Sequence, residues 1–312
     1  MIKKIFLIFS ASFLLILLGI FLYFHKYQNL PEFAFSLLPE ARIPAKNEKM
    51  IIFAPHADDE TLGLGGFMAK AIQNGAEVIV VLVTNGDGHR FSSMEEFRKI
   101  YPNSQDYIQS GYTRQEEAKK ALGILGVKSE NIYFLGYPDL GIKELLDKNW
   151  LTPYQSPYTK QSSSPYNNSF HQNVSYTGEN LQNDILAIIQ KYQPEMVVTT
   201  LPQDIHPDHR ATGNFVRKAV EKLSEPKPKI AFYLIHFRHF PNPKGWHKDR
   251  LLTPPMKLIK PYEFSKISLD QKTLDLKEKA FLEYKSQLKS PFLKKLMISF
   301  LRQNELLFVP KS

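Results

Sequence analysis

Short apolar runs and amphipathic segments alternate along most of the chain beyond residue 49. Continuous apolar runs rich in β-branched residues are typical of parallel strands that are covered on both faces. Segments with apolar residues every three or four positions predict helices. We expect a helix after the first strand, strands at 50–54, 77–84, 132–135, 196–200 and 230–235, and helices at 113–125, 181–192, 211–223 and 279–288.

This alternation predicts one α/β domain with a Rossmann-like, mainly parallel sheet and helices on both faces. Ligands of such sheets bind outside the carboxyl ends of the strands. Residues that are distant in sequence are therefore expected to meet along that edge. Polar loops follow four of the expected strands, at 55–60, 85–88, 136–139 and 204–209.

The amino terminus begins with an uncharged apolar run. Positions 5–24 are rich in Leu, Ile and Phe, with Lys3 and Lys4 before the run and Lys26 after it. About 20 apolar residues span a bilayer. A cleaved signal peptide usually has an apolar region of about 7–15 residues followed by a small-residue cleavage site, which this sequence lacks. The sequence therefore predicts an uncleaved transmembrane anchor over residues 1–26.

This anchor sets the expected domain organisation. Residues 27–48 contain three prolines and predict a tether, and residues 49–312 form the expected catalytic domain. The chain is thus predicted to be a single-pass membrane protein. The lysines before the apolar run favour an extracytoplasmic catalytic domain, although Lys26 weakens this asymmetry and leaves a cytoplasmic domain as the alternative.

Composition narrows the chemistry of any site. The sequence contains no cysteine, which excludes disulfide bonds and thiolate zinc ligands, so a metal must be held by imidazole and carboxylate. The formal charge of +9 favours anionic partners and suits a protein beside anionic lipid. Zinc-finger spacings and aromatic RNA-binding signatures are missing from the sequence, so we do not expect nucleic acid as a partner.

The loop after the first expected strand is strongly acidic. It carries His56, Asp58, Asp59 and Glu60 immediately before a predicted helix. One of these carboxylates could simply cap that helix. Three clustered negative charges repel one another unless a cation compensates them, which favours a metal site.

The loop after the fourth expected strand carries His206, Asp208 and His209. Taken alone, either histidine is equally well explained as a surface residue. Two imidazoles and one carboxylate from the two loops, together with a bound water, would complete a four-coordinate catalytic zinc site. His56 and Asp59 are three positions apart, as are the two histidines of this loop, so a tight turn could direct each pair into one cavity.

Residues 55–60 and 206–209 resemble the two signature motifs of the PIG-L/LmbE family of zinc-dependent N-deacetylases. Further similarity, within a match over most of residues 49–290, lies at 114–118, 137–139 and 286–287. One departure is Ala57, where the family commonly has proline, but no chemical group is lost there. The resemblance implies a hydrolase that removes the acetyl group from an N-acetylglucosamine-type conjugate and uses zinc or another divalent metal.

The resemblance also implies the roles of individual residues. His56, Asp59 and His209 would hold the metal. Asp58 matches the general base, and His206 matches the residue that stabilises the oxyanion or protonates the leaving amine. Because zinc lowers the pKa of a bound water toward about 7, a neighbouring carboxylate and a hydrogen-bond donor are the groups that amide hydrolysis needs.

The resemblance also bears on three further residues. Asp208 is expected to orient His206, with simple exposure as the alternative. Asp139 matches a position where family members bind sugar hydroxyls. Arg90 lies near a position that is used similarly, and an exposed surface charge explains it equally well.

Two long connections and the carboxyl-terminal segment complete the expectations. Residues 89–112 and 147–177 are long enough to be lids or binding surfaces. Residues 291–301 predict a core helix, although an interfacial helix on anionic lipid would fit the anchor and the net charge. The tyrosines that could stack on sugar rings are Tyr154, Tyr158, Tyr166 and Tyr176.

Other functions fit the sequence less well. A membrane-tethered sugar-binding protein without turnover is disfavoured because every catalytic position of the family pattern is present. The Gly63 to Gly66 stretch suggests a nucleotide-binding domain, but its spacing is not G-x-G-x-x-G. Hydrolysis of another amide stays open. The expected substrate is an N-acetylated amino sugar on a lipid or an envelope glycan close to the membrane.

Overall fold

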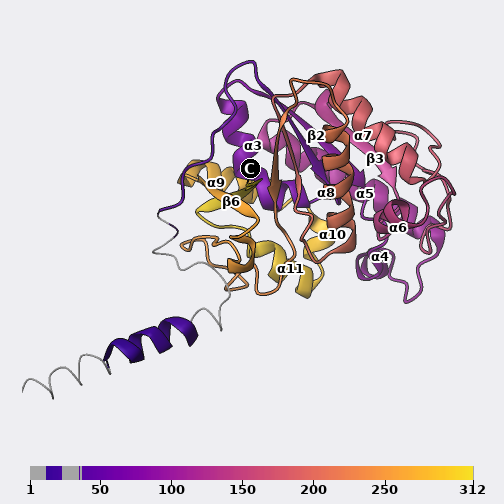
Figure 1. Ribbon diagram of the computed structural model, residues 1–312. Coiled ribbons are helices and arrows are strands. Elements are labelled where there is room, and N and C mark those ends of the chain that lie inside the picture. Colours follow the sequence, from indigo (N-terminus) through magenta and orange to yellow (C-terminus); the bar gives the residue numbers. More distant parts are fainter. Residues whose placement is uncertain (1–11, 23–34, 36, 312) are drawn as a thin grey trace, which may run out of the picture.

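The computed structural model describes residues 12–22, 35 and 37–311, and these include one seven-stranded sheet (Figure 1). The strand order is β3-β2-β1-β4-β5-β7-β6, in which the first five strands are parallel and the last two are antiparallel. The strands span Lys49–Ala54 (β1), Glu77–Thr84 (β2), Ile132–Tyr137 (β3), Met196–Thr200 (β4), Lys229–Tyr233 (β5), Tyr262–Ser268 (β6) and Asn304–Pro310 (β7).

Helices cover both faces of this sheet (Figure 1). One layer contains α3, α5 and α9, and the other contains α6, α7 and α8. Alternate side chains of β1 enter two separate cores, Met50 and Ile52 on one face and Ile51 and Phe53 on the other. The helices span Asp59–Gln73 (α3), Arg90–Phe97 (α4), Ser104–Leu125 (α5), Ile142–Asp147 (α6), Gly178–Tyr192 (α7), Pro207–Glu221 (α8), Gln271–Phe281 (α9), Lys285–Leu288 (α10) and Pro291–Ile298 (α11).

The parallel half of the sheet confirms the predicted α/β fold. Strands β2 and β4 have the predicted bounds, and β1, β3 and β5 differ from the prediction by one or two residues at an end. Strand β1 lies between β2 and β4, so the chain order reverses there. A reversal of this kind opens a crevice at the carboxyl ends of the two neighbouring strands.

Several expected elements differ from the structure. The antiparallel strands β6 and β7 were not predicted, and the expected helix at 279–288 is divided between α9 and α10. The expected loop at 89–112 is mostly helical, because His89 caps α4 and Asn103 caps α5 with a capping box.

The glycines of the rival nucleotide motif lie inside α3 and serve close packing. A Cβ on Gly63 would come within 2.4 Å of Tyr233, and one on Gly66 would come within 2.4 Å of Leu269. These contacts between α3 and its neighbours leave the glycines no phosphate-binding turn.

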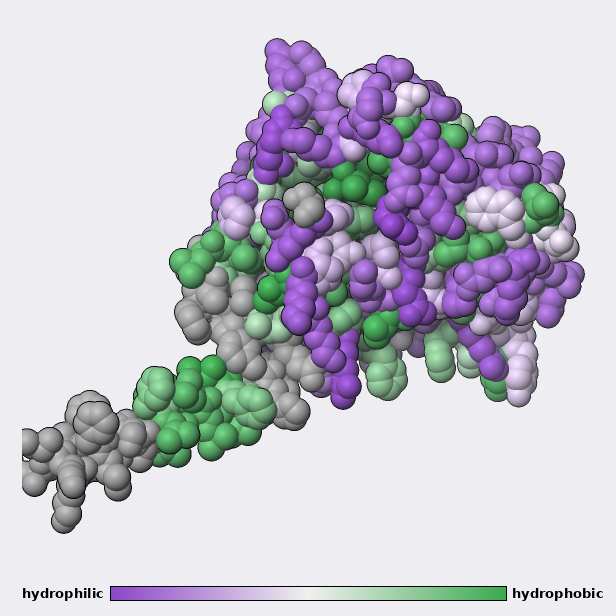
Figure 2. All heavy atoms as spheres, in the orientation of Figure 1, coloured by the Kyte–Doolittle hydropathy of each residue, from purple (hydrophilic) through white to green (hydrophobic). Residues whose placement is uncertain are grey.

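The predicted membrane anchor is not supported by the described residues. Residues 12–22 form an exposed apolar helix, shown in green in Figure 2, and the rest of the predicted run lies outside the described residues. Across residues 12–22, 35 and 37–311, no helix is both long enough and apolar enough for a membrane crossing. Because a crossing needs about 20 residues, the prediction of a single-pass membrane location with an extracytoplasmic domain is wrong on this finding.

The second half of the predicted tether packs against the domain. The Ala41 N–H donates to the Lys266 carbonyl at 2.7 Å, and the Lys266 N–H donates to the Pro39 carbonyl at 2.9 Å. Phe35 is buried in the core beneath α3 and β6. The described part of this segment therefore extends the folded unit.

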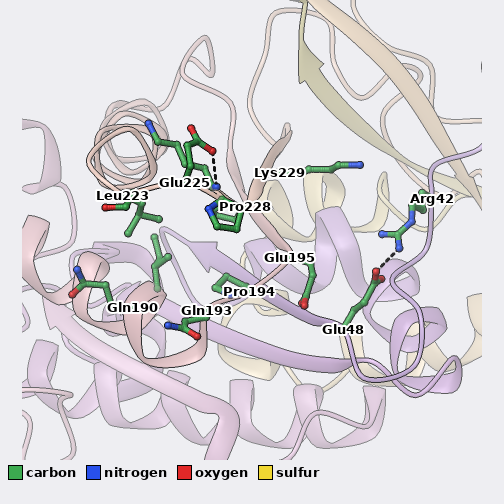
Figure 3. Close-up of a pocket in the computed structure, with 14 residues that line it drawn as sticks. Arg42, Glu48, Gln190, Gln193, Pro194, Glu195, Leu223, Glu225, Pro228 and Lys229 are labelled. Atoms are coloured by element: carbon green, nitrogen blue, oxygen red, sulfur yellow. Dashed lines mark hydrogen bonds and ion pairs between the residues drawn. The ribbon is translucent and has the colours of Figure 1, made fainter.

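A cavity of about 830 Å³ lies at the amino ends of the parallel strands (Figure 3). Glu48, Glu195 and Lys229, which line it, lie at or just before the starts of β1, β4 and β5. Arg42 pairs there with Glu48. This cavity is at the opposite edge of the sheet from the histidines of the two motifs.

Candidate active site

The carboxyl ends of β1 and β4 bring three candidate metal ligands together. The Nδ1 atom of His56 lies 3.1 Å from Oδ2 of Asp59 and 3.2 Å from Nε2 of His209, and the last two atoms are 3.1 Å apart. Bonds of about 2.0–2.1 Å connect zinc to imidazole and carboxylate, so three atoms with this spacing can all reach one ion. The predicted ligand set fits a divalent metal.

Local backbone structure holds these three side chains in place. Asp59 is the first residue of α3, and its carboxylate accepts a hydrogen bond from the His56 N–H at 3.0 Å. His209 lies in the first turn of α8, which begins at Pro207. Proline suits a helix start because the missing N–H would have no partner there.

The cluster attracts positive charge. Burial alone would lower the pKa of His209, but the carboxylates of Asp59 and Asp204 raise it to about 9. A neutral imidazole is the form that binds metal, so a cation would replace the proton that this site otherwise takes up.

Carboxylates behind the two histidines fix their orientation. The Nδ1 atom of His209 lies 3.1 Å from Oδ2 of Asp204, which leaves Nε2 facing the other two ligands. The Nε2 atom of His56 lies 3.1 Å from Oδ1 of Asp139 and 3.4 Å from Oδ2 of Asp208. Carboxylates of this kind fix the tautomer of a metal-binding histidine. Asp204 was not assigned from the sequence, although it begins the fourth polar loop.

The structure corrects the expected partner of Asp208. Its carboxylate contacts His56 and accepts the backbone N–H groups of Leu140 at 2.6 Å and Ile142 at 3.1 Å. Its contact with His206 is made by its backbone N–H alone. Asp208 therefore positions the His56 ring and joins the β3 loop to α8.

The two predicted sugar-binding residues lie in different surroundings. Asp139 is buried in the cluster, where its two oxygens contact His56 and the Gly88 N–H. Arg90 is exposed at the start of α4, where its guanidinium donates to the Ile100 carbonyl and lies over the Tyr101 ring. The structure thus brings Asp139 to the site, whereas the described contacts of Arg90 are all outside it.

Asp58 lies beside the ligands in a strained backbone conformation. Its φ of 138° is in the region that favours glycine. Such strain persists only where surrounding contacts enforce it, and it is concentrated at functional sites. Burial raises the pKa of Asp58 to about 8, against the opposing charge of Arg114. A carboxylate with a pKa near neutral pH is suited to proton transfer.

Arg114 holds the turn that carries Asp58. The buried guanidinium donates to the carbonyls of Gly86 at 2.7 Å and Ala57 at 2.8 Å, and it lies 3.3 Å from the Asp58 carboxylate. Gly86 has a φ of 67°, and a Cβ there would lie 1.8 Å from the Arg114 side chain. The sequence placed Arg114 in a matching motif but did not assign it a role.

His206 is a neutral hydrogen-bond donor. It caps α8, and its Nδ1 accepts the Asp208 N–H at 3.3 Å, so the ring proton is on Nε2. Burial, together with the nearby imidazoles of His56 and His209, lowers the pKa of His206 to about 2. Its ring centre is 4.9 Å from that of His56.

His236 is a fourth histidine of the cluster that sequence reasoning missed. It lies three residues after the end of β5, and its ring centre is 4.7 Å from that of His209. Burial and the charge of His209 lower the pKa of His236 to about 4. The rule that placed the other loops at the carboxyl ends of strands applies to this residue as well.

Only two of the four tyrosines suggested for sugar stacking are accessible. Tyr166 is 1% exposed and Tyr176 is 0% exposed, which excludes both from stacking on a ligand. Tyr154 and Tyr158 are half-buried.

The prediction of a core helix at 291–301 holds only in part. Met297 is the buried residue of α11 and Phe292 is 90% exposed, whereas Phe300 and Leu301, after the helix end, are buried in the core.

This chain is similar to known sugar deacetylases. A diacetylchitobiose deacetylase of Thermococcus kodakarensis is 29% identical over 216 residues, which are 65% of this chain and 62% of the relative. A probable N-acetyl-alpha-D-glucosaminyl L-malate deacetylase 2 of Bacillus anthracis is 26% identical over 62% of this chain and 68% of its own length. This chain thus spans less than two thirds of the first of these relatives.

A solved structure shows the same fold. The N,N'-diacetylchitobiose deacetylase of Pyrococcus horikoshii matches with a TM-score of 0.51 and 22% identity, over 84% of each chain. The family model for PIG-L, described as GlcNAc-PI de-N-acetylase, matches residues 51–220, which are more than half of the 312 residues. The matched range includes His56, Asp59 and His209 but not His236. With both signature loops assembled at one edge of the expected sheet, this chain belongs to the PIG-L family.

Proposed function

We propose that this chain is a metal-dependent hydrolase that removes the acetyl group from an N-acetylglucosamine-type sugar, with zinc as the metal. The observation that carries this proposal is the triangle of His56, Asp59 and His209 with the strained carboxylate of Asp58 beside it. The deacetylase relatives support the same reaction.

The side chains around the triangle fit the needs of amide hydrolysis. When bound, a divalent cation supplies Lewis acidity that polarises the amide carbonyl and makes water more acidic. Asp58 accepts a proton from the attacking water, and its raised pKa lets it return that proton to the leaving nitrogen. The Nε2–H of neutral His206 donates to the oxygen on which negative charge develops.

We further propose that residues 49–312 form one deacetylase domain and that Asp139 contacts a sugar hydroxyl. The shared sheet, which includes strands from Lys49 to Pro310, supports the first part. The position of Asp139 beside His56 supports the second. A lipid-linked or envelope glycan as the acceptor now depends on the family description alone, since the predicted anchor no longer supports it.

Two substitutions in the loop after β1 test the division of roles. Asp58→Asn should keep a stoichiometric zinc ion and lose about 10²–10⁴-fold in turnover, because only the proton acceptor is removed. His56→Ala should lose both zinc and activity, because one of three ligands is gone. Metal content by elemental analysis and amine release from N-acetylglucosamine conjugates measure the two effects.

The same measurements distinguish the proposed hydrolase from a sugar-binding protein without turnover. That alternative predicts sugar binding by the zinc-loaded protein without amine release from any conjugate. Loss of zinc in the Asp58→Asn variant would contradict the assignment of Asp58 as the base.

A further inference from the structure

The long segment between α6 and α7 brings a tyrosine to the edge of the metal cluster. The Tyr158 ring lies against Gly88, where an added Cβ would be 3.2 Å from Cδ2 of the ring and 3.1 Å from Oδ2 of Asp139. The other oxygen of Asp139 contacts His56. Because Gly88 has no side chain, the Tyr158 ring and the Asp139 carboxylate can both lie against its backbone.

The Tyr158 ring is held from behind and half-buried. Tyr107 is 7% exposed and contacts it edge to face, with ring centres 5.4 Å apart. The backbone N–H of Tyr158 donates to the hydroxyl of Ser156 at 3.3 Å. The Lys160 N–H donates to the Ser156 carbonyl at 3.0 Å and closes the turn. The ring is therefore held in place and keeps an accessible part, as stacking on a ligand requires.

The loop after β3 adds an apolar side chain to the same edge. Leu140 directly follows Asp139, has a φ of 60° and is 38% exposed. Its backbone N–H donates to Asp208 at 2.6 Å, which enforces the strained conformation. Tyr154 packs beside it on Gly141, where an added Cβ would lie 2.7 Å from the ring. Exposed apolar area and backbone strain therefore coincide next to the cluster.

We propose that Tyr158 forms a stacking subsite for a second pyranose ring joined to the sugar that is deacetylated, with Leu140 as the exposed apolar side chain next to Asp139 in the β3 loop. The C–H face of a pyranose is apolar and suits an aromatic ring, while its hydroxyl edge suits the polar groups around Gly88. The substrate is then an oligosaccharide rather than a free amino sugar. This inference depends on the proposed function, because the second ring is defined by its link to the reacting sugar.

Kinetics with one and two sugar rings test the subsite. We compare N-acetylglucosamine with N,N'-diacetylchitobiose in the zinc-loaded full chain and in Tyr158→Ala, Tyr158→Leu and Tyr158→Phe. Loss of the flat ring in the first two variants should raise KM for the disaccharide about tenfold with little change in kcat, and KM for the monosaccharide should stay within about twofold. Tyr158→Phe should behave like the wild type, because it keeps the ring.

Tyr112→Ala is the matched control. Tyr112 is also half-buried and contacts a buried tyrosine edge to face, Tyr166 at 5.0 Å, but it lies on α5. It should leave both KM values unchanged. An equal effect of Tyr158→Ala on both substrates, or full activity of Tyr158→Leu on the disaccharide, would overturn the subsite.

A binding measurement separates failure of the subsite from failure of the proposed reaction. The glucosamine disaccharide has no acetyl group to lose, so its affinity, measured by calorimetry, is independent of turnover. Binding that depends on the Tyr158 ring without deacetylation of either substrate would reject the reaction and keep the subsite. Deacetylation of both substrates without any dependence on Tyr158 would reject the subsite and keep the reaction. Failure of the wild-type protein to bind the glucosamine disaccharide would also reject the subsite.

Discussion

The two edges of the parallel sheet place their polar groups in opposite ways. At the amino edge, a cavity of about 830 Å³ is lined by side chains such as Glu48 and Lys229 at the surface, and Arg42 forms an exposed ion pair (Figure 3). At the carboxyl edge, Asp59 is 2% exposed, and it lies within a cluster of buried carboxylates and imidazoles. The large cavity therefore lies at the amino ends of the strands, whereas the buried carboxylates and imidazoles lie at their carboxyl ends.

This difference shows which features indicate function. Surface charges at the amino edge are solvated, so their arrangement has little effect on the free energy of folding. Such an arrangement is therefore weak evidence of a functional site. Burying several carboxylates beside one another is unfavourable unless a ligand compensates them. The carboxyl edge also keeps Asp58 in a strained backbone conformation, with a φ of 138°. The unfavourable free energy of burying charged groups and straining the backbone, rather than the size of a cavity, therefore identifies the site.

Matched arginine substitutions at the two edges should give the largest contrast. Arg114→Met should lower activity about a hundredfold, because a small displacement of the base is sufficient for such a loss. It should also lower the free energy of unfolding by about 3–5 kcal/mol, because the buried Asp58 loses its partner. Arg42→Met should change neither activity nor stability measurably.

Steady-state kinetics and urea unfolding measure both variants. Zinc content should be retained in Arg114→Met, and Arg114→Lys should recover part of kcat by restoring the charge. A purely structural role for Arg114 predicts that kcat of the folded, zinc-loaded variant equals that of the wild type.

The carboxylates behind the metal ligands should have an intermediate effect. Asp204→Asn and Asp208→Asn should each weaken zinc binding about 10–100-fold, because each fixes the ring of one ligand histidine. Glu195→Gln at the amino edge is the control and should leave zinc affinity unchanged. Competition with a chromogenic chelator measures all three affinities, and equal values would remove the distinction between the edges.

The smallest expected effect concerns the pH dependence of stability in the metal-free protein. Burial holds the pKa of His236 at about 4, below the value of 6.5 in an unfolded chain. The unfolded state therefore takes up a proton first as pH falls below 6.5, and the stability from neutral His236 is lost progressively until about pH 4.

Removing the imidazole should remove this loss. Between pH 7 and pH 5, the wild type should lose about 2 kcal/mol more of its unfolding free energy than His236→Gln does, at 1.36 kcal/mol per pKa unit. Urea unfolding in the presence of a chelator measures the difference. Parallel pH profiles for the two proteins would show that His236 titrates normally.

The parallel half of the fold was predictable because its strands have continuous apolar runs. The continuous apolar run within Glu77–Thr84 is recognisable without knowledge of the residues around it in the fold, and it matches β2. Strand β6 is instead a mixed segment at the sheet edge, with Glu263 and Lys266 among its residues, so its pattern resembles a loop. Its pairing with β7 depends on residues about 40 positions further along the chain, which local patterns do not reveal.

The site was predictable to the extent that motifs define it. The three ligands and Asp58 lie in two short loops, so their types and spacing were sufficient to bring them together. Arg114 acts from α5, and only the folded sheet shows that it lies beside the cluster. His236 directly follows the strand expected at 230–235, so the rule for the carboxyl ends of strands could have placed it there. The burial of Tyr166 follows from its hydrogen bond to Asp87, 79 residues away, which composition cannot show.

The order of the strands has a consequence for synthesis of the chain. His56 and His209, whose rings meet at 3.2 Å, are 153 positions apart. During translation, β1 can pair with β2 early, but its other edge waits until β4 emerges much later. The two halves of the proposed metal site are therefore separate until β4 and the start of α8 have been synthesised, and the site can be complete only when the centre of the sheet is complete.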